Sequence, residues 1–120
     1  MIKTNQNFIK SSRIQRTEDF RQTLRQGEKQ KQGGLIVYVK RNNLGFARLG
    51  LALSKKIIPS AIIRNRLKRL IRESFRLNQQ RLPNLDIIIV VTRRSLYNNQ
   101  IFVCDLDKQW SRLAISYKRT

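Results

Sequence analysis

The residues of this chain that could do chemistry are mostly basic, and they are concentrated between residues 55 and 76. This stretch holds eight basic residues and a single acidic one, Glu73. Arg64, Lys68 and Arg72 recur at four-residue steps, which places them along one ridge of a helix. Like charges at this spacing destabilise a free helix by about 0.2–0.5 kcal/mol per pair, so a binding function should offset the cost. Guanidinium groups bind phosphate through paired hydrogen bonds, so the ridge suits a phosphodiester backbone.

The charge of the whole chain favours a polyanionic partner. Lys and Arg number 26 against 7 Asp and Glu, which gives a formal net charge of +19 over 120 residues. A basic helix face is often only solvated surface, but this large excess destabilises a compact state unless a polyanion neutralises it. A membrane surface is the alternative polyanion, yet no apolar run approaches the roughly 20 residues of a membrane span. We therefore predict a nucleic-acid partner and no membrane.

The side chains that usually catalyse hydrolysis are scarce. The chain has no histidine and one cysteine, Cys104, which excludes Ser-His and Cys-His pairs, an intramolecular disulfide and a multi-cysteine zinc site. Two-metal hydrolysis needs oxygen ligands around ions about 4 Å apart, and no pair of carboxylates stands out for that role. We expect Asp86 to fix a turn or to pair with an arginine. A protein-only nuclease that uses Asp86 with another acid is the alternative.

The elements that position these residues begin with a short helix. Thr17 is suited to cap it, and Phe20 and Leu24 share one face at a spacing of four. Gly27 is a plausible terminator. The polar stretch over residues 26–34 is then predicted to be a loop.

Two strands follow, over residues 35–41 and 47–54, with a hairpin turn predicted at residues 42–45. In the second strand, leucines alternate with a small and nearly flat face that includes Gly50 and Ala52. The leucine face belongs to the core. The flat face admits either a packed helix or an extended backbone lying close to the strand.

The second half predicts a long helix, a buried strand and a last helix. Ser60 suits the cap of a helix over residues 60–76, in which apolar residues recur with helical spacing. Residues 86–92 contain a continuous apolar run, which is typical of a strand buried on both faces. Asn98 or Asn99 is expected to cap the last helix, whose apolar side is marked by Phe102, Leu106, Trp110, Leu113 and Tyr117.

The element order is therefore α-β-β-α-β-α, an α/β (α+β two-layer) fold with a small mixed sheet packed by helices. A chain of this length forms a single domain, residues 1–120. Residues 1–16 carry four basic residues and no acid, and we expect them to form a flexible basic arm. If the strands at 47–54 and 86–92 are parallel, the long helix is their crossover, and the general rule predicts a right-handed connection.

An ordered pattern of residues runs through most of the chain. Its centre reads Arg64-Asn65-Arg66-x-Lys68-Arg69-x-x-Arg72-Glu73-x-Phe75-Arg76, preceded by Leu51-x-Leu53-Ser54-Lys55-Lys56 and by Ala61. It extends to Thr17-Glu18-Asp19-Phe20, Tyr38 and Leu85-Asp86, and so covers about residues 13–110. This pattern resembles the signature of the bacterial ribonuclease P protein family. A match over many ordered positions is far more specific than a short motif.

The resemblance implies a fold and a surface that contacts the large catalytic RNA. In that family the arginine-rich helix is a left-handed βαβ crossover, so the resemblance predicts the left-handed form against the general rule. The residues expected to bind the catalytic RNA are Lys55, Lys56, Arg64, Asn65, Arg66, Lys68, Arg69, Arg72 and Arg76. Asn65 adds an amide that can both donate and accept hydrogen bonds at base edges or ribose hydroxyls.

The resemblance also implies a cleft for the single-stranded 5′ leader of precursor tRNA. The residues expected to line it are Phe20, Leu24, Ile36, Tyr38, Lys40, Gly50 and Ala52. Phe20 would stack on a leader base, and ordinary core packing of this ring is the alternative. Many relatives carry a second aromatic residue where this chain has Leu24, which weakens a two-ring stacking model.

The resemblance finally implies which component of the ribonucleoprotein cleaves the substrate. The expected function is removal of the 5′ leader from precursor tRNA by a cytoplasmic ribonucleoprotein, with one protein chain per RNA. Catalysis and Mg²⁺ would belong mainly to the RNA, so this chain would hold no tightly bound cofactor, no metal and no catalytic residue. A structural protein that binds ribosomal RNA is the alternative, because it would share the size, the charge and the missing catalytic groups.

Overall fold

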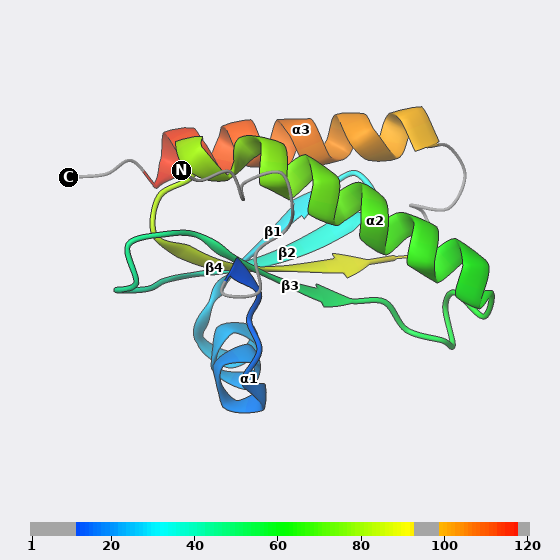
Figure 1. Cartoon of the computed structure of the whole chain (residues 1–120), viewed down its shortest axis with the longest axis horizontal. Coiled ribbons are helices and arrows are strands. Elements are labelled where there is room, and N and C mark those ends of the chain that lie inside the picture. Colours follow the sequence, from blue (N-terminus) through cyan, green and yellow to red (C-terminus); the bar gives the residue numbers. More distant parts are fainter. Residues whose placement is uncertain (1–11, 93–98, 118–120) are drawn as a thin grey trace, which may run out of the picture.

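A four-stranded mixed sheet forms the centre of the computed structural model, which describes residues 12–92 and 99–117 (Figure 1). The strands are β1 (Glu28–Gln32), β2 (Leu35–Arg41), β3 (Arg48–Ala52) and β4 (Leu85–Val91). They lie in the order β1-β2-β4-β3. β2 runs antiparallel to both β1 and β4, whereas β3 runs parallel to β4. The apolar run of β4 is therefore central in the sheet, as its composition predicts.

Helices cover both faces of this sheet. They are α1 (Thr17–Gln26), α2 (Ala61–Asn78) and α3 (Asn99–Ser116), with a short 3₁₀ turn, η3 (Gln79–Arg81), after α2. Figure 1 shows α2 and α3 on one side of the sheet and α1 on the other. The predicted fold class, a small mixed sheet packed by helices, is confirmed. The predicted two-layer arrangement is wrong because helices pack on both faces, and the predicted order α-β-β-α-β-α lacks β1. Within the described ranges, no helix is both long and apolar enough to cross a membrane.

The core lies between the sheet and the pair formed by α2 and α3. Leu67, Ile71 and Phe75 recur at four-residue steps on α2, and each is at most 1% exposed. The ring of Trp110 on α3 meets the ring of Phe75 edge-on, with centroids 5.7 Å apart. The indole N–H of Trp110 donates to Ser74 Oγ at 2.7 Å, which satisfies its polar atom inside the core.

α2 begins and packs as its sequence predicts. Ser60 is the N-cap, and its hydroxyl accepts a hydrogen bond from the backbone N–H of Ile63 at 3.2 Å. The helix then continues to Asn78, two residues beyond the predicted end. It connects β3 to the parallel strand β4, so the predicted crossover is present. The hand of this crossover stays a prediction.

The strand pairing differs from the prediction in two ways. Residues 28–32 form β1 rather than part of a loop, and β1 is the strand that makes a hairpin with β2. β2 and β3 do not pair with each other, because β4 lies between them. Residues 42–45 therefore connect strands that are not neighbours. The predicted loop was wrong because β1 is polar and has only one buried residue, Gln30, so it lacks a hydrophobic alternation.

The beginning of the described chain is held against the sheet. Ser12 and Ile14 are buried, and the N–H of Ile14 donates to the carbonyl of Leu49 at 3.0 Å. Residues 12–14 are thus not a free arm, while residues 1–11 of the predicted arm lie outside the described residues. Thr17 is the first residue of α1 rather than its cap, because Arg16 occupies the cap position without a capping side-chain bond.

Gly27 closes α1, as predicted. Its backbone N–H donates to the carbonyl of Thr23 at 2.9 Å. A Cβ at this position would meet that carbonyl at 2.4 Å, so the close approach requires glycine. The predicted cap at Asn98 lies outside the described residues, and α3 begins at Asn99. The predicted apolar side of α3 is confirmed: Phe102, Leu106, Trp110 and Leu113 are buried, and Tyr117 packs against the core.

Candidate nucleic-acid interface

The outer side of α2 carries a connected basic surface. Asn65, Lys68, Arg69 and Arg72 line one hollow of about 430 Å³, together with Glu73. The Glu73 carboxylate accepts hydrogen bonds from Arg76, which lowers the pKa of Glu73 and raises that of Arg76. The single acid of this helix is therefore already paired. The hollow keeps a net positive charge that suits a phosphate backbone.

Arg64 and Arg66 of α2 were predicted to bind RNA but do not line this hollow. The guanidinium of Arg64 donates to the carbonyls of Ile58 and Pro59 at 2.8 and 3.0 Å, so it ties the turn before α2 to the helix. Successive residues are about 100° apart around a helix, so Arg66 and Lys68 point to nearly opposite sides. The predicted set does not share a single face. Lys55 and Lys56 are exposed in the turn that precedes α2.

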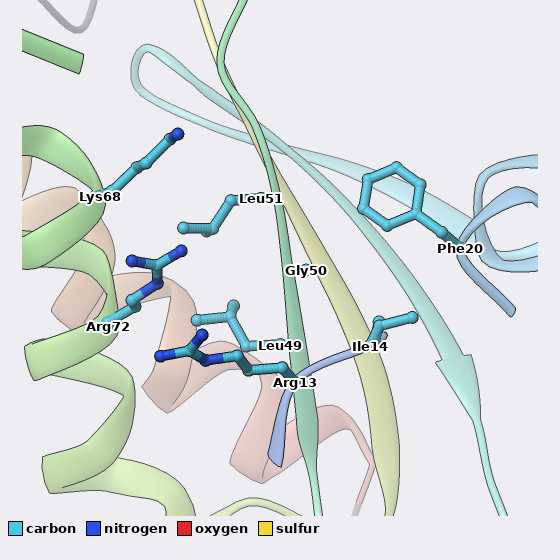
Figure 2. Close-up of a pocket in the computed structure, with 8 residues that line it drawn as sticks. All are labelled: Arg13, Ile14, Phe20, Leu49, Gly50, Leu51, Lys68 and Arg72. Carbon is cyan, nitrogen blue, oxygen red and sulfur yellow. The ribbon is translucent and has the colours of Figure 1, made fainter. Parts of the chain in front are cut away.

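A pocket lies at the outer edge of β3, between α2 and the segment at residues 12–14. Its volume is about 190 Å³, and it is lined by Arg13, Ile14, Phe20, Leu49, Gly50, Leu51, Lys68 and Arg72. Figure 2 shows Arg13, Lys68 and Arg72 on the α2 side of β3 and Phe20 on the other side. Partial burial lowers the pKa of Arg72, and the positive charge of Arg13 lowers it further. The pocket therefore gathers cations that repel one another.

The sheet face beneath α1 carries most of the residues predicted for the leader cleft. Ile36, Tyr38 and Lys40 of β2 lie opposite Val90, Ile88 and Asp86 of β4. Gly50 and Ala52 of β3 lie opposite Ile88 and Val90 from the other side. Residues directly opposite each other in a sheet share a face, so the structure brings these five predicted residues together. Ile36, Tyr38, Lys40 and Ala52 are partly exposed there.

Gly50 lies on the predicted cleft face but is covered by another side chain. A Cβ at Gly50 would lie 2.9 Å from Cε2 of Phe20, so the ring rests directly on this glycine, which is buried. The Phe20 side chain stays partly exposed and lines the pocket at the edge of β3. The ring thus packs on the sheet on one side and borders the pocket on the other, and its stacking on a leader base stays a prediction. Leu24 is 37% exposed on α1.

An ion-pair network fastens α1 to this face. Asp86 is 5% exposed, and its carboxylate accepts from Arg48 Nε and Nη2 at 2.9 and 2.7 Å. Asn42 Nδ2 also donates to Asp86 at 2.8 Å. Arg48 reaches Asp19 of α1 at 3.6 Å. The bond to Asp86 raises the pKa of Arg48. Asp86 therefore pairs with an arginine, as predicted. Across the described ranges, no three His, Cys, Asp or Glu side chains form a group that could hold a metal ion.

The sequence interpretation missed three basic residues. Arg13 belongs to the predicted flexible arm, although its backbone forms a parallel bridge with Leu49 of β3. Lys29 and Lys31 were placed in a loop, although they lie opposite Tyr38 and Ile36 and so share the face beneath α1. The alternation of Lys29 and Lys31 was the sequence signal that could have predicted this strand. The residue between them is polar, so the alternation of apolar and polar residues that is typical of a strand is missing.

A mixed sheet with a basic crossover helix on one face and a partly open basic face on the other is typical of a nucleic-acid-binding protein. Comparisons with known proteins specify the class. The family model for Ribonuclease P matches residues 8–114. The chain is 40% identical over 111 residues to the ribonuclease P protein component of Legionella pneumophila (strain Corby), covering 92% of this chain and 96% of that one. It is 37% identical over 109 residues to that of Vibrio campbellii, covering 89% and 92%.

Solved structures agree with this result. The RNase P protein of Staphylococcus aureus superposes with a TM-score of 0.74 at 25% identity, covering 91% of this chain and 97% of that one. The RNase P protein of Thermotoga maritima, solved in complex with 1-(4-fluorophenyl)-2-thiourea, gives a TM-score of 0.72 at 25% identity, covering 85% and 97%. This chain belongs to the bacterial ribonuclease P protein family.

Proposed function

We propose that this chain is the RNA-binding protein subunit of a ribonuclease P ribonucleoprotein, which removes the 5′ leader from precursor tRNA in the cytoplasm. Membership of the family supports the assignment. The observation that carries it is the hollow on α2, where Asn65, Lys68, Arg69 and Arg72 are gathered beside an acid that is already paired. We assign this surface to the large catalytic RNA, with one chain per RNA.

The face beneath α1 is the proposed site of the leader. Tyr38 and Ile36 offer apolar and aromatic surface, and Lys29, Lys31 and Lys40 surround them on the same face. Aromatic rings flanked by cations are typical of surfaces that bind single-stranded nucleic acid, because bases stack and phosphates pair. Phe20 belongs to the same proposal through its exposed part.

The cleavage itself is proposed to belong to the RNA. The chain has no histidine, and the buried Asp86 is engaged by Arg48 and Asn42, which suits a structural role. Mg²⁺ would be bound mainly by the RNA. The protein would raise the affinity for substrate by holding the leader, and it would lessen the repulsion between two polyanions.

The test is reconstitution of the full chain with a bacterial ribonuclease P RNA at low Mg²⁺. We expect the protein to stimulate cleavage of precursor tRNA, and the chain alone to cleave nothing. Failure of the protein to stimulate cleavage would contradict the proposal and favour a structural role on ribosomal RNA. Hydrolysis of RNA by the isolated chain would contradict the proposed division of labour.

Phe20→Ala tests the leader site in the same reconstituted enzyme. We expect weaker binding of precursor tRNA, by about 1–3 kcal/mol for one lost stacking contact, and unchanged binding of mature tRNA. Phe20→Tyr is the control, since it keeps the ring. Equal losses for precursor and mature tRNA would contradict a role of Phe20 at the leader.

A further inference from the structure

The pocket at the edge of β3 joins two surfaces that the proposed function treats separately. Phe20 and Gly50 belong to the side beneath α1, whereas Lys68 and Arg72 belong to α2 (Figure 2). β3 is the last strand of the sheet, and among the described residues the segment at residues 12–14 lies along its outer edge. The pocket therefore passes around this edge, from the ring of Phe20 to the cations of α2.

Arg13 is fixed in position by its neighbours. Gln79 donates to Ser12 Oγ at 2.8 Å and to the carbonyl of Ala47 at 3.0 Å. The backbone of Ile14 is bonded to Leu49, and the Ile14 side chain is buried. The fold thus holds the backbone of Arg13 between two anchored residues. Its side chain is directed toward α2, where Arg72 and Lys68 reach the same gap above Leu49 and Leu51 (Figure 2).

The charged side chains that line this gap are all basic. Two guanidinium groups and one ammonium group line the pocket, and none of its eight lining residues is acidic. Repulsion between Arg13 and Arg72 costs free energy in the unbound protein, and a shared anion would remove that cost. Guanidinium groups favour the paired geometry of phosphate oxygens, and an aromatic ring in the same pocket favours a base.

We propose that Arg13, Lys68 and Arg72 hold one phosphodiester group of a single-stranded RNA that crosses the outer edge of β3 next to Phe20. This inference rests on the proposed function and extends it, because it makes Arg13 a binding residue and gives the RNA a path between the two surfaces. The phosphate comes from the leader or from a single-stranded part of the catalytic RNA. The chemistry is the same for both sources.

Binding by the reconstituted enzyme distinguishes the two sources. For Arg13→Ala we expect about 10- to 100-fold weaker binding of precursor tRNA with unchanged mature tRNA, if the leader supplies the phosphate. The same loss in affinity for the catalytic RNA would identify that RNA as the source. Arg13→Lys should retain part of the affinity. Arg16→Ala is the matched control, since it removes one exposed charge from the same segment outside the pocket.

A second measurement is independent of ribonuclease P activity. The full-length chain is titrated with a short single-stranded RNA, and the side-chain Nε–H signals of arginine are followed by NMR. We expect the signals of Arg13 and Arg72 to shift together in the unsubstituted chain, and the shift of Arg72 to be lost in the double variant Arg13→Ala/Lys68→Ala. Unchanged Arg13 and Arg72 signals, or an Arg13→Ala loss no larger than that of Arg16→Ala, would overturn the inference while leaving the proposed function intact.

Discussion

Asp86 illustrates how a residue that resembles a catalytic group acts as an anchor. It lies on β4 beneath α1, and it binds Arg48 through two hydrogen bonds while Arg48 also reaches Asp19. A buried ion pair requires both partners, because removal of one leaves the other charge without compensation. Arg48 therefore links β3 to β4 through Asp86 and to α1, the helix that carries Phe20, through Asp19.

Asp86→Asn separates this structural role from a catalytic one. We expect the free energy of unfolding to fall by about 1.5–3 kcal/mol in urea denaturation, because hydrogen bonds to a charged partner are lost. The folded variant should still support normal cleavage by the reconstituted enzyme at saturating protein. Loss of cleavage with unchanged stability would instead favour the protein-only nuclease interpretation.

At the scale of elements, α2 separates two tasks along its length. Arg64 ties the turn before α2 to the helix, whereas Asn65, Lys68, Arg69 and Arg72 line the basic hollow. A basic motif that looks uniform in sequence thus contains one residue that stabilises the turn and others that are available to bind RNA. Substitutions at Arg64 should therefore lower protein stability, whereas substitutions at Arg69 should weaken only RNA binding.

Arg69→Ala and Arg64→Ala test that difference. For Arg69→Ala we expect assembly with the catalytic RNA to weaken by about 1–3 kcal/mol without loss of protein stability. For Arg64→Ala we expect protein stability to fall by about 1 kcal/mol as well, since two carbonyls lose their donor. Binding titrations and thermal unfolding measure the two effects. Lys108→Ala, an exposed position on α3, is the control for charge alone, and an equal loss there would contradict a specific role of Arg69.

The two glycines with positive φ, Gly33 between β1 and β2 and Gly45 between β2 and β3, differ in their surroundings. Gly33 has a φ of +57°, and a Cβ there would lie 2.0 Å from Oδ2 of Asp105 on α3. Gly45 has a φ of +87° and would meet no atom within 4 Å. Both positions favour glycine, but only Gly33 also needs the space.

Gly33→Ala should consequently destabilise the protein more than Gly45→Ala. For Gly45→Ala we expect a loss of about 1–2 kcal/mol from the left-handed backbone alone. For Gly33→Ala we expect about 0.5–1.5 kcal/mol more, because the buried Asp105 side chain must turn away from its rotamer. Urea denaturation of the two variants gives the comparison. Equal losses would show that α3 does not press on this turn.

At the scale of the whole molecule, the net charge of +19 should dominate the affinity for RNA. Each phosphate that the protein neutralises releases counterions, so affinity falls with salt. If about four phosphates are neutralised, affinity should drop about 100-fold between 50 and 200 mM salt. Binding titrations over that range measure the slope, and a flat profile would contradict an electrostatic interface. Arg69→Ala should lower the slope, whereas Lys108→Ala should leave it nearly unchanged.

The sequence alone determined the elements whose signals are local. Ser60 and the four-residue recurrence of Leu67, Ile71 and Phe75 predict α2 because capping and periodicity act within a few residues. The continuous apolar run of β4 predicts a central strand for the same reason. The basic motif of α2 and its resemblance to a family were likewise visible along the chain.

The tertiary structure decided what depends on distant partners. β1 is polar, so only its pairing with β2 and its packing under α3 make it a strand. β4, and not β2, became the neighbour of β3 because strand pairing follows burial across the sheet rather than order along the chain. Arg13 and Arg72 are far apart in sequence, and they face one pocket only because residues 12–14 pair with the edge of β3. Local patterns specify elements, whereas a binding site needs the long-range contacts that bring those elements together.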